Sequence, residues 1–202
     1  MYEKFYTDLK LIPYSTKYDE TKQLSNLYFK NYDFKNHSES LERLYKLLEF
    51  DYYKHYRLPR NFSSKYINTN YDRLRITKNY EKNQNLETIN IGFFGGSTMF
   101  GIGSESDNET IPSLVAKLLN QKNSKLNFEI FNFGVNGYNN SQEILYFLEI
   151  YKKYDFDFVF FYDFVNESIH TSHNEALKPG HLRSDNFLTP ITQWESIVKF
   201  LK

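Results

Sequence analysis

The chain has 202 residues, and its 25 Lys and Arg residues are balanced by 25 Asp and Glu residues, so its formal net charge is zero. Nucleic-acid binding needs clustered positive charge to neutralise phosphates, and no basic stripe follows the chain, so no nucleic-acid partner is expected. Cysteine is absent, which excludes thiol nucleophiles, disulfides and thiolate metal sites. Serine and carboxylate chemistry remain.

No apolar run is long enough for a signal-peptide core or a membrane span. We therefore expect a cytoplasmic protein with no membrane segment. The length suits one α/β domain preceded by an extension. Because the composition and the apolar pattern of the chain change near residue 86, we divide it into an N-terminal extension, 1–86, and an α/β domain, 87–202.

The extension is polar, rich in tyrosine and free of glycine. Apolar residues recur in steps of three and four from Ser38 to Phe50, which predicts an amphipathic helix capped by Ser38 or Ser40. Residues 52–77 favour extended segments and turns, and we expect them to pack against the α/β domain. Residues 78–87 are interpreted as a polar linker.

Strand-like and helix-like segments alternate from residue 89 onwards. Apolar runs of strand length occupy 89–94, 128–133 and 156–162, and the third is apolar on both faces, as in a parallel sheet covered by helices on both sides. This order predicts a doubly wound α/β unit with right-handed crossovers. The first helix, 110–121, has Pro112 in its first turn and is expected to bury Leu114, Val115, Leu118 and Leu119. The second is expected to start at the cap Ser141 and to bury Ile144, Leu145, Phe147, Leu148 and Tyr151.

Polar groups and glycines follow each of the predicted strands, where an open parallel sheet binds its ligands. Ser97 follows the first strand, Gly137 lies after the second, and Asn166 after the third. A serine hydroxyl can attack a carbonyl, a glycine lets its backbone N–H approach an oxyanion, and an asparagine amide supplies another donor. Together, the residues that follow the three predicted strands favour acyl-transfer chemistry.

The stretch Gly95-Gly96-Ser97-Thr98-Met99-Phe100-Gly101 resembles the Gly-Asp-Ser signature of the SGNH (GDSL-like) hydrolases, in the Gly-Gly-Ser-Thr variant of bacterial members. Gly137 matches the family's oxyanion glycine and Asn166 its oxyanion asparagine, and the resemblance covers residues 89 to about 168. It implies a flavodoxin-like three-layer α/β/α sandwich and a serine esterase or deacetylase acting on O-acyl esters, often on carbohydrates. Ser97 would be the nucleophile, and no cofactor or metal is implied.

The chain departs from the family pattern in two places. Val165 and Glu167 flank Asn166 where many members carry glycine and aspartate, and nothing after Asn166 matches the Asp-x-x-His motif that supplies the general base. We therefore expect the chain to end before that half of the site, leaving 156–162 as an edge strand open to self-association. The alternative is a catalytically inactive remnant or a non-catalytic carbohydrate-binding module, which a histidine within reach of Ser97 would argue against.

Other motifs fit less well. A phosphate-binding loop needs lysine where Ile102 stands, and a dinucleotide fingerprint needs glycine where Ser106 stands. The spacing Glu167-x-x-His170-x-x-His173 resembles a metal-ligand pattern, but we interpret these histidines as solvated loop residues. Taken alone, Ser97 could be a helix or turn cap and Asn166 the start of an Asx turn.

Overall fold

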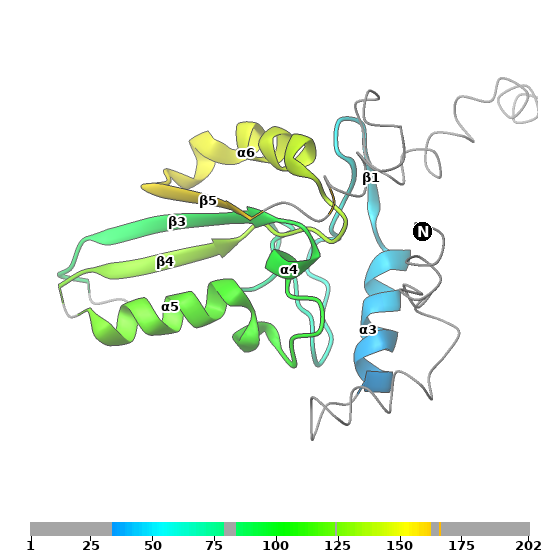
Figure 1. Ribbon diagram of the computed structural model, residues 1–202, viewed down its shortest axis with the longest axis horizontal. Coiled ribbons are helices and arrows are strands. Elements are labelled where there is room, and N and C mark those ends of the chain that lie inside the picture. The colour runs from blue at the N-terminus through cyan, green and yellow to red at the C-terminus, as the bar shows by residue number, and fades with distance from the viewer. Residues whose placement is uncertain (1–33, 79–83, 124, 163–165, 167–202) are drawn as a thin grey trace, which may run out of the picture.

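The computed structural model describes residues 34–78, 84–123, 125–162 and 166 (Figure 1). This part of the chain is mixed α/β, with helices on opposite faces of a parallel sheet. In chain order the elements are α3 (Phe34–Lys46), β1 (Glu49–Asp51), β2 (His55–Arg57), β3 (Thr88–Gly95), α4 (Ser97–Phe100), the 3-10 helix η1 (Asp107–Glu109), α5 (Ile111–Lys122), β4 (Asn127–Asn132), α6 (Asn140–Tyr154) and β5 (Phe158–Tyr162).

The three-stranded sheet has the order β4-β3-β5, and both neighbours run parallel to the central β3. Ile91 is paired with Ile130 on one side and with Phe158 on the other. Helix α5 lies on one face of the sheet and α6 on the other (Figure 1). The predicted strands and their central first member are therefore confirmed.

The predicted helix starts are only partly correct. Helix α5 begins close to the predicted residue 110, and Thr110 caps it, its side chain accepting a hydrogen bond from the Ser113 amide. Ser141 does not cap α6, because Asn139 does so in a capping box with Gln142. Neither Ser38 nor Ser40 caps the first helix, since α3 already begins at Phe34, and the Ser40 hydroxyl bonds the Asn36 carbonyl inside it.

The end of that first helix was also predicted too late. Helix α3 stops at Lys46, and residues 49 and 50, expected to end the helix, belong to β1 and pair antiparallel with β2.

The buried faces of the two sheet-covering helices differ from the prediction. Of the α5 residues expected to be buried, Leu114 and Leu118 are exposed, and the helix buries Pro112, Ser113 and Ala116 instead. Most of the predicted α6 face points outward as well. The residues of α6 that are exposed against prediction are Ile144, Leu145, Leu148 and Tyr151, whereas Gln142, Glu143 and Tyr146 are buried.

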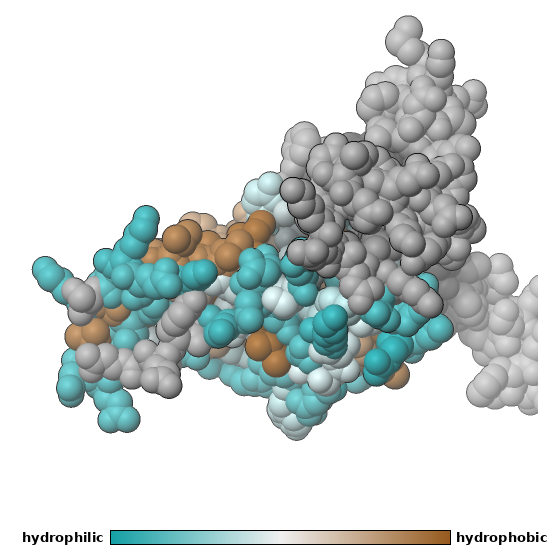
Figure 2. Space-filling view, turned by 90° about the horizontal axis from the view of Figure 1, so that it is seen from below, coloured by the Kyte–Doolittle hydropathy of each residue, from teal (hydrophilic) through white to brown (hydrophobic). Residues whose placement is uncertain are grey.

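Strand β5 was expected to be covered on both faces, but it is largely exposed. The exposed fractions of Phe158 and Tyr162 are 57% and 58%. Phe160 stacks on Phe93 at a ring distance of 5.1 Å, whereas Phe161 stacks on Phe94 on the opposite face. Exposed apolar side chains form the brown areas on the described part of the face in Figure 2.

Residues 52–77 pack against the sheet as predicted. They form β2, turns and isolated bridges, including one between Arg75 and Asn132 at the end of β4. Their apolar side chains share one core with the α6 face of the sheet. This core includes Tyr56, Leu58, Phe62, Tyr66, Ile67 and Leu74 from the segment, together with Phe94, Phe100, Phe133, Val135, Tyr138 and Tyr146.

No helix among the described residues combines the length and the apolar composition that crossing a bilayer requires.

His37 of α3 makes the stability of this core depend on pH. Its ring is 3% exposed and packs edge-on against Tyr66. Burial first, and then the charge of Arg75, lowers the pKa of His37 from 6.5 to about 4. Between these pH values the unfolded chain binds a proton that the folded chain does not, so stability should fall as the pH falls.

We expect His37 to remove roughly 3 kcal/mol of the free energy of unfolding as the pH drops from 6.5 to about 4. Urea unfolding across this range measures the slope. His37→Gln should flatten it, and His55→Gln, at a less buried histidine whose pKa burial also lowers, should remove less of it. An unchanged slope in His37→Gln would contradict the assignment.

Candidate functional site

Ser97 lies at the carboxyl end of the central strand. It is the first residue of α4, two positions after β3 ends at Gly95. The short helix is closed by hydrogen bonds from the Phe100 amide to the Gly96 carbonyl and from the Gly101 amide to the Ser97 carbonyl, each 3.0 Å long. Gly101 ends it with φ of 90°, a left-handed conformation that favours glycine. The serine is thus presented on a tight strand-to-helix turn.

Asn166 lies beside the residue that precedes Ser97. A Cβ atom placed on Gly96 would come within 2.7 Å of the Asn166 amide nitrogen and 3.2 Å of the Tyr138 carbonyl oxygen. The Asn166 amide donates a hydrogen bond to that same Tyr138 carbonyl. The residues that follow β3, β4 and β5 therefore meet at one point, and a side chain at position 96 would have to displace the Asn166 amide.

Gly137 is the neighbour of Tyr138 in the loop after β4. Its φ of 84° is again left-handed. The loop is held at both ends: the Val135 amide donates to the Gly95 carbonyl at 3.0 Å, and the Tyr138 amide donates to the Val135 carbonyl at 3.1 Å. The structure thus brings Ser97, Gly137 and Asn166 to the same end of the sheet, where the sequence placed them.

Tyr56 from β2 fixes the Gly137 loop from outside. Its hydroxyl donates to the Asn136 carbonyl at 2.7 Å, and the Tyr138 hydroxyl donates back to the Tyr56 carbonyl. The two rings pack edge-on, 5.4 Å apart. Burial raises the pKa of the Tyr138 phenol well above its ordinary value, so the group stays a neutral donor.

Gly134 brings the loop after β4 into direct contact with the helix that carries Ser97. A Cβ atom on Gly134 would lie within 2.6 Å of the Met99 carbonyl carbon and 2.7 Å of the Phe100 Cα. Two backbones therefore touch at this point, and no side chain can separate them.

Arg75 holds the other end of α4. Its guanidinium donates to the carbonyls of Phe100 at 2.9 Å and Gly101 at 2.7 Å, and also to the Tyr66 carbonyl at 2.9 Å. Nε donates to Asp107 at 2.8 Å, and the side chain is completely buried. Carbonyls at the end of a helix lack intrahelical donors and attract positive charge, so Arg75 satisfies the end of the Ser97 helix.

Sequence reasoning missed both Arg75 and Tyr56. Each acts on groups far away along the chain, and each lies in a segment of mixed polar and aromatic residues. No local spacing distinguishes either residue from its neighbours.

No described residue is a candidate for the general base. His37 packs on Tyr66 in the core and His55 lies in β2, and neither forms a hydrogen bond with Ser97. Glu167, His170 and His173, whose spacing resembles a metal motif, lie outside the described residues. Among the described residues, no cluster of His, Asp or Glu could hold a metal ion.

No family model and no curated protein matches the chain. What the site does therefore has to be inferred from its own residues.

Proposed function

We propose that the protein is a serine hydrolase of the SGNH type that cleaves O-acyl esters, with an acylated carbohydrate as the substrate class. The observation that carries the proposal is the meeting of the Asn166 amide with Gly96, directly before Ser97. A flavodoxin-like three-layer sandwich is the corresponding fold. The parallel sheet, with α5 and α6 on opposite faces, supports it.

In this proposal the Ser97 hydroxyl attacks the ester carbonyl, and negative charge develops on the carbonyl oxygen. The backbone N–H groups of Ser97 and Gly137 and the Asn166 amide stabilise that charge. One Asn166 N–H is engaged by the Tyr138 carbonyl, which orients the amide and leaves its second N–H for the oxyanion. Donors fixed in advance stabilise a transition state without reorganisation.

In this proposal the N-terminal extension holds the oxyanion donors in place. Arg75 ties down the end of α4, and Tyr56 ties down the loop that contains Gly137. Misplacing a catalytic group by about 1 Å can cost on the order of a hundredfold in rate. Residues 54–75 are therefore part of the catalytic scaffold in this proposal.

A non-catalytic carbohydrate-binding module is the second candidate function. It is favoured by one observation: no described histidine forms a hydrogen bond with Ser97. A serine without a base is a poor nucleophile, although oxyanion donors and binding alone retain roughly a thousandfold rate enhancement over water.

Hydrolysis of p-nitrophenyl acetate and of an acetylated sugar by the 202-residue chain tests the proposal. We expect turnover well below that of an enzyme with a complete triad, and we expect Ser97→Ala to lower it to the residual rate that the oxyanion donors and binding support. Ser141→Ala, which changes an exposed serine in the first turn of α6, is the matched control and should leave the rate unchanged. Turnover in Ser97→Ala equal to that of the unchanged chain would refute the assignment, and binding of the acetylated sugar without turnover would favour the binding module.

A further inference from the structure

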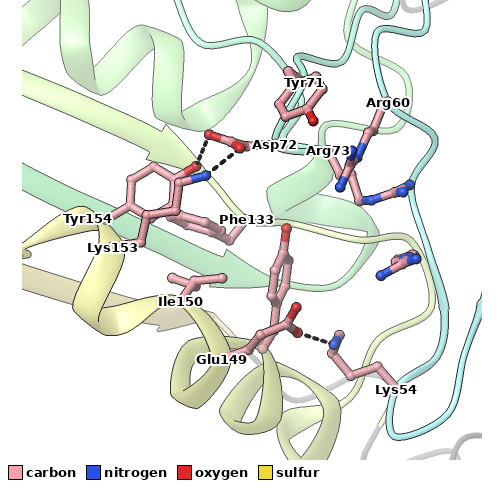
Figure 3. A pocket seen from close by; sticks show the side chains of 12 residues that line it. Lys54, Arg60, Tyr71, Asp72, Arg73, Phe133, Glu149, Ile150, Lys153 and Tyr154 are labelled. Carbon is pink, nitrogen blue, oxygen red and sulfur yellow. Dashed lines mark hydrogen bonds and ion pairs between the residues drawn. The ribbon is translucent and has the colours of Figure 1, made fainter.

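A pocket lies between residues 54–73 and α6, and Ser97 is not part of its lining (Figure 3). Its volume is about 240 Å³, somewhat below the ~300 Å³ at which pockets for drug-sized ligands begin, so it suits a ligand of about one ring. Phe133 and Ile150 line the pocket with apolar side chains, and it is also lined by the aromatic rings of Tyr71, Tyr146 and Tyr154. Ser97, Gly137 and Asn166 do not line it.

The charges around this pocket are distributed unevenly. On the α6 side, Asp72 binds Lys153 and Tyr154, and Glu149 binds Lys54, as the dashed lines in Figure 3 show. These groups neutralise one another. The hydrogen bond from Lys153 holds the pKa of Asp72 below its ordinary value, so the carboxylate stays ionised.

On the opposite side lie three arginines, and two of them share the carboxylate of Glu49. Glu49 accepts from Arg73 at 2.7 Å and lies 3.4 Å from Arg57. Arg73 also donates to the Leu58 carbonyl at 2.7 Å, so its guanidinium is already used in the fold. Arg60 is exposed and stacks on Tyr71, 4.5 Å from the ring centroid. Within the described chain this side therefore carries an excess of positive charge.

Two donors at the pocket have no partner among the described residues. Arg57 Nε is buried without a hydrogen bond. The Tyr146 side chain lines the pocket and is only 9% exposed, and none of the hydrogen bonds within the described chain involves its hydroxyl. For the buried Arg57 Nε the missing partner costs about 1 to 3 kcal/mol, and a bound acceptor would remove that cost.

We propose that this pocket binds a small organic anion, with its carboxylate or phosphate held by Arg57 and Arg60 and its ring against Phe133 and Ile150. The Tyr146 hydroxyl donates a hydrogen bond to the ring's substituents. Guanidinium groups match the paired oxygens of both anions, which makes carboxylate and phosphate the shared chemistry. The proposal is independent of hydrolysis at Ser97.

Calorimetric titration of the full chain with glucuronate, glucose 6-phosphate, inorganic phosphate and neutral glucose tests the proposal. We expect saturable binding of glucuronate or glucose 6-phosphate, weaker binding of inorganic phosphate, and none of glucose. Whichever organic anion binds more tightly identifies the anionic group. Absence of binding by both organic anions at millimolar concentrations would overturn the proposal, as would equal binding of glucose.

Variants then locate the site. Arg60→Gln and Arg57→Gln should each weaken binding about tenfold or more, as expected for losing a hydrogen bond to a charged group. Lys152 lies on α6, the helix beside the pocket, but does not line the pocket. Lys152→Gln removes its positive charge and should leave the affinity for the anion unchanged. A loss in Lys152→Gln equal to that in Arg60→Gln would reveal general electrostatic attraction and overturn the site.

Tyr146→Phe provides a readout in the absence of ligand. Because its hydroxyl has no partner in the described chain, removing it should leave the thermal midpoint unchanged or raise it, while weakening anion binding severalfold. A lower midpoint together with unchanged affinity would show that the hydroxyl serves the fold and not a ligand.

Discussion

Replacing Arg75 by methionine should lower the free energy of unfolding by about 3 to 5 kcal/mol, the usual cost of removing one partner of a buried ion pair. The guanidinium is completely buried and serves Asp107 together with the carbonyls of Tyr66, Phe100 and Gly101. Methionine fills similar space but removes the guanidinium from all four acceptors, of which Asp107 keeps its bonds from Asn68. Urea unfolding followed by circular dichroism measures the loss.

Two variants sharpen this test. Arg75→Lys keeps the charge but presents a single nitrogen to acceptors spread around a planar fork, so an intermediate loss is expected. Arg43→Met changes an exposed arginine over the Phe62 ring and should cost less than about 1 kcal/mol. A loss below that size in Arg75→Met would mean that the end of α4 does not depend on Arg75.

Gly134→Ala should destabilise the protein by about 3 kcal/mol, the upper part of the usual range for overpacking a core. The added methyl group would lie 2.6 Å from the Met99 carbonyl carbon and 2.7 Å from the Phe100 Cα. Both atoms belong to the backbone and cannot rotate away, so α4 has to move. We therefore also expect any ester turnover that depends on Ser97 to fall with stability.

Gly103→Ala is the control for this prediction. Its φ of 84° is left-handed, but no atom lies within 4 Å of an added Cβ, so it should cost only the conformational strain of about 1 to 2 kcal/mol. Equal losses in Gly134→Ala and Gly103→Ala, measured by the same urea unfolding, would contradict the backbone contact at Gly134.

The sequence predicts the strands, and the placement of Ser97, Gly137 and Asn166 at one end of the sheet, because both depend on local patterns. Short apolar runs ended by glycine mark β3 and β4, and the polar residues after them have to meet at one edge of a parallel sheet. The meeting of Gly96 with Asn166 follows from that geometry. The start of α6 was also readable, since Asn139 and Gln142 have the spacing of a capping box.

Which helix face is buried could not be read from the sequence. Helix α6 carries apolar residues on several sides, so more than one stripe satisfies the helical period. Its buried side is selected by what it packs against: Gln142 donates to the Lys54 carbonyl at 2.8 Å, and the ring of Tyr146 meets those of Phe94 and Phe133. These partners are distant in the chain, and so are those of Arg75.

The interlocking of residues 54–75 with the sheet determines the order in which the protein can assemble. Lys54 meets Gln142 across 88 positions of the chain, and Tyr56 meets Tyr138 across 82. During synthesis, the early segment leaves the ribosome long before these partners exist, with Leu58, Phe62 and Ile67 of the later core unburied. Contacts of such long range slow folding and prolong the exposure of apolar surface, so the nascent chain depends on protection from aggregation until α6 has emerged.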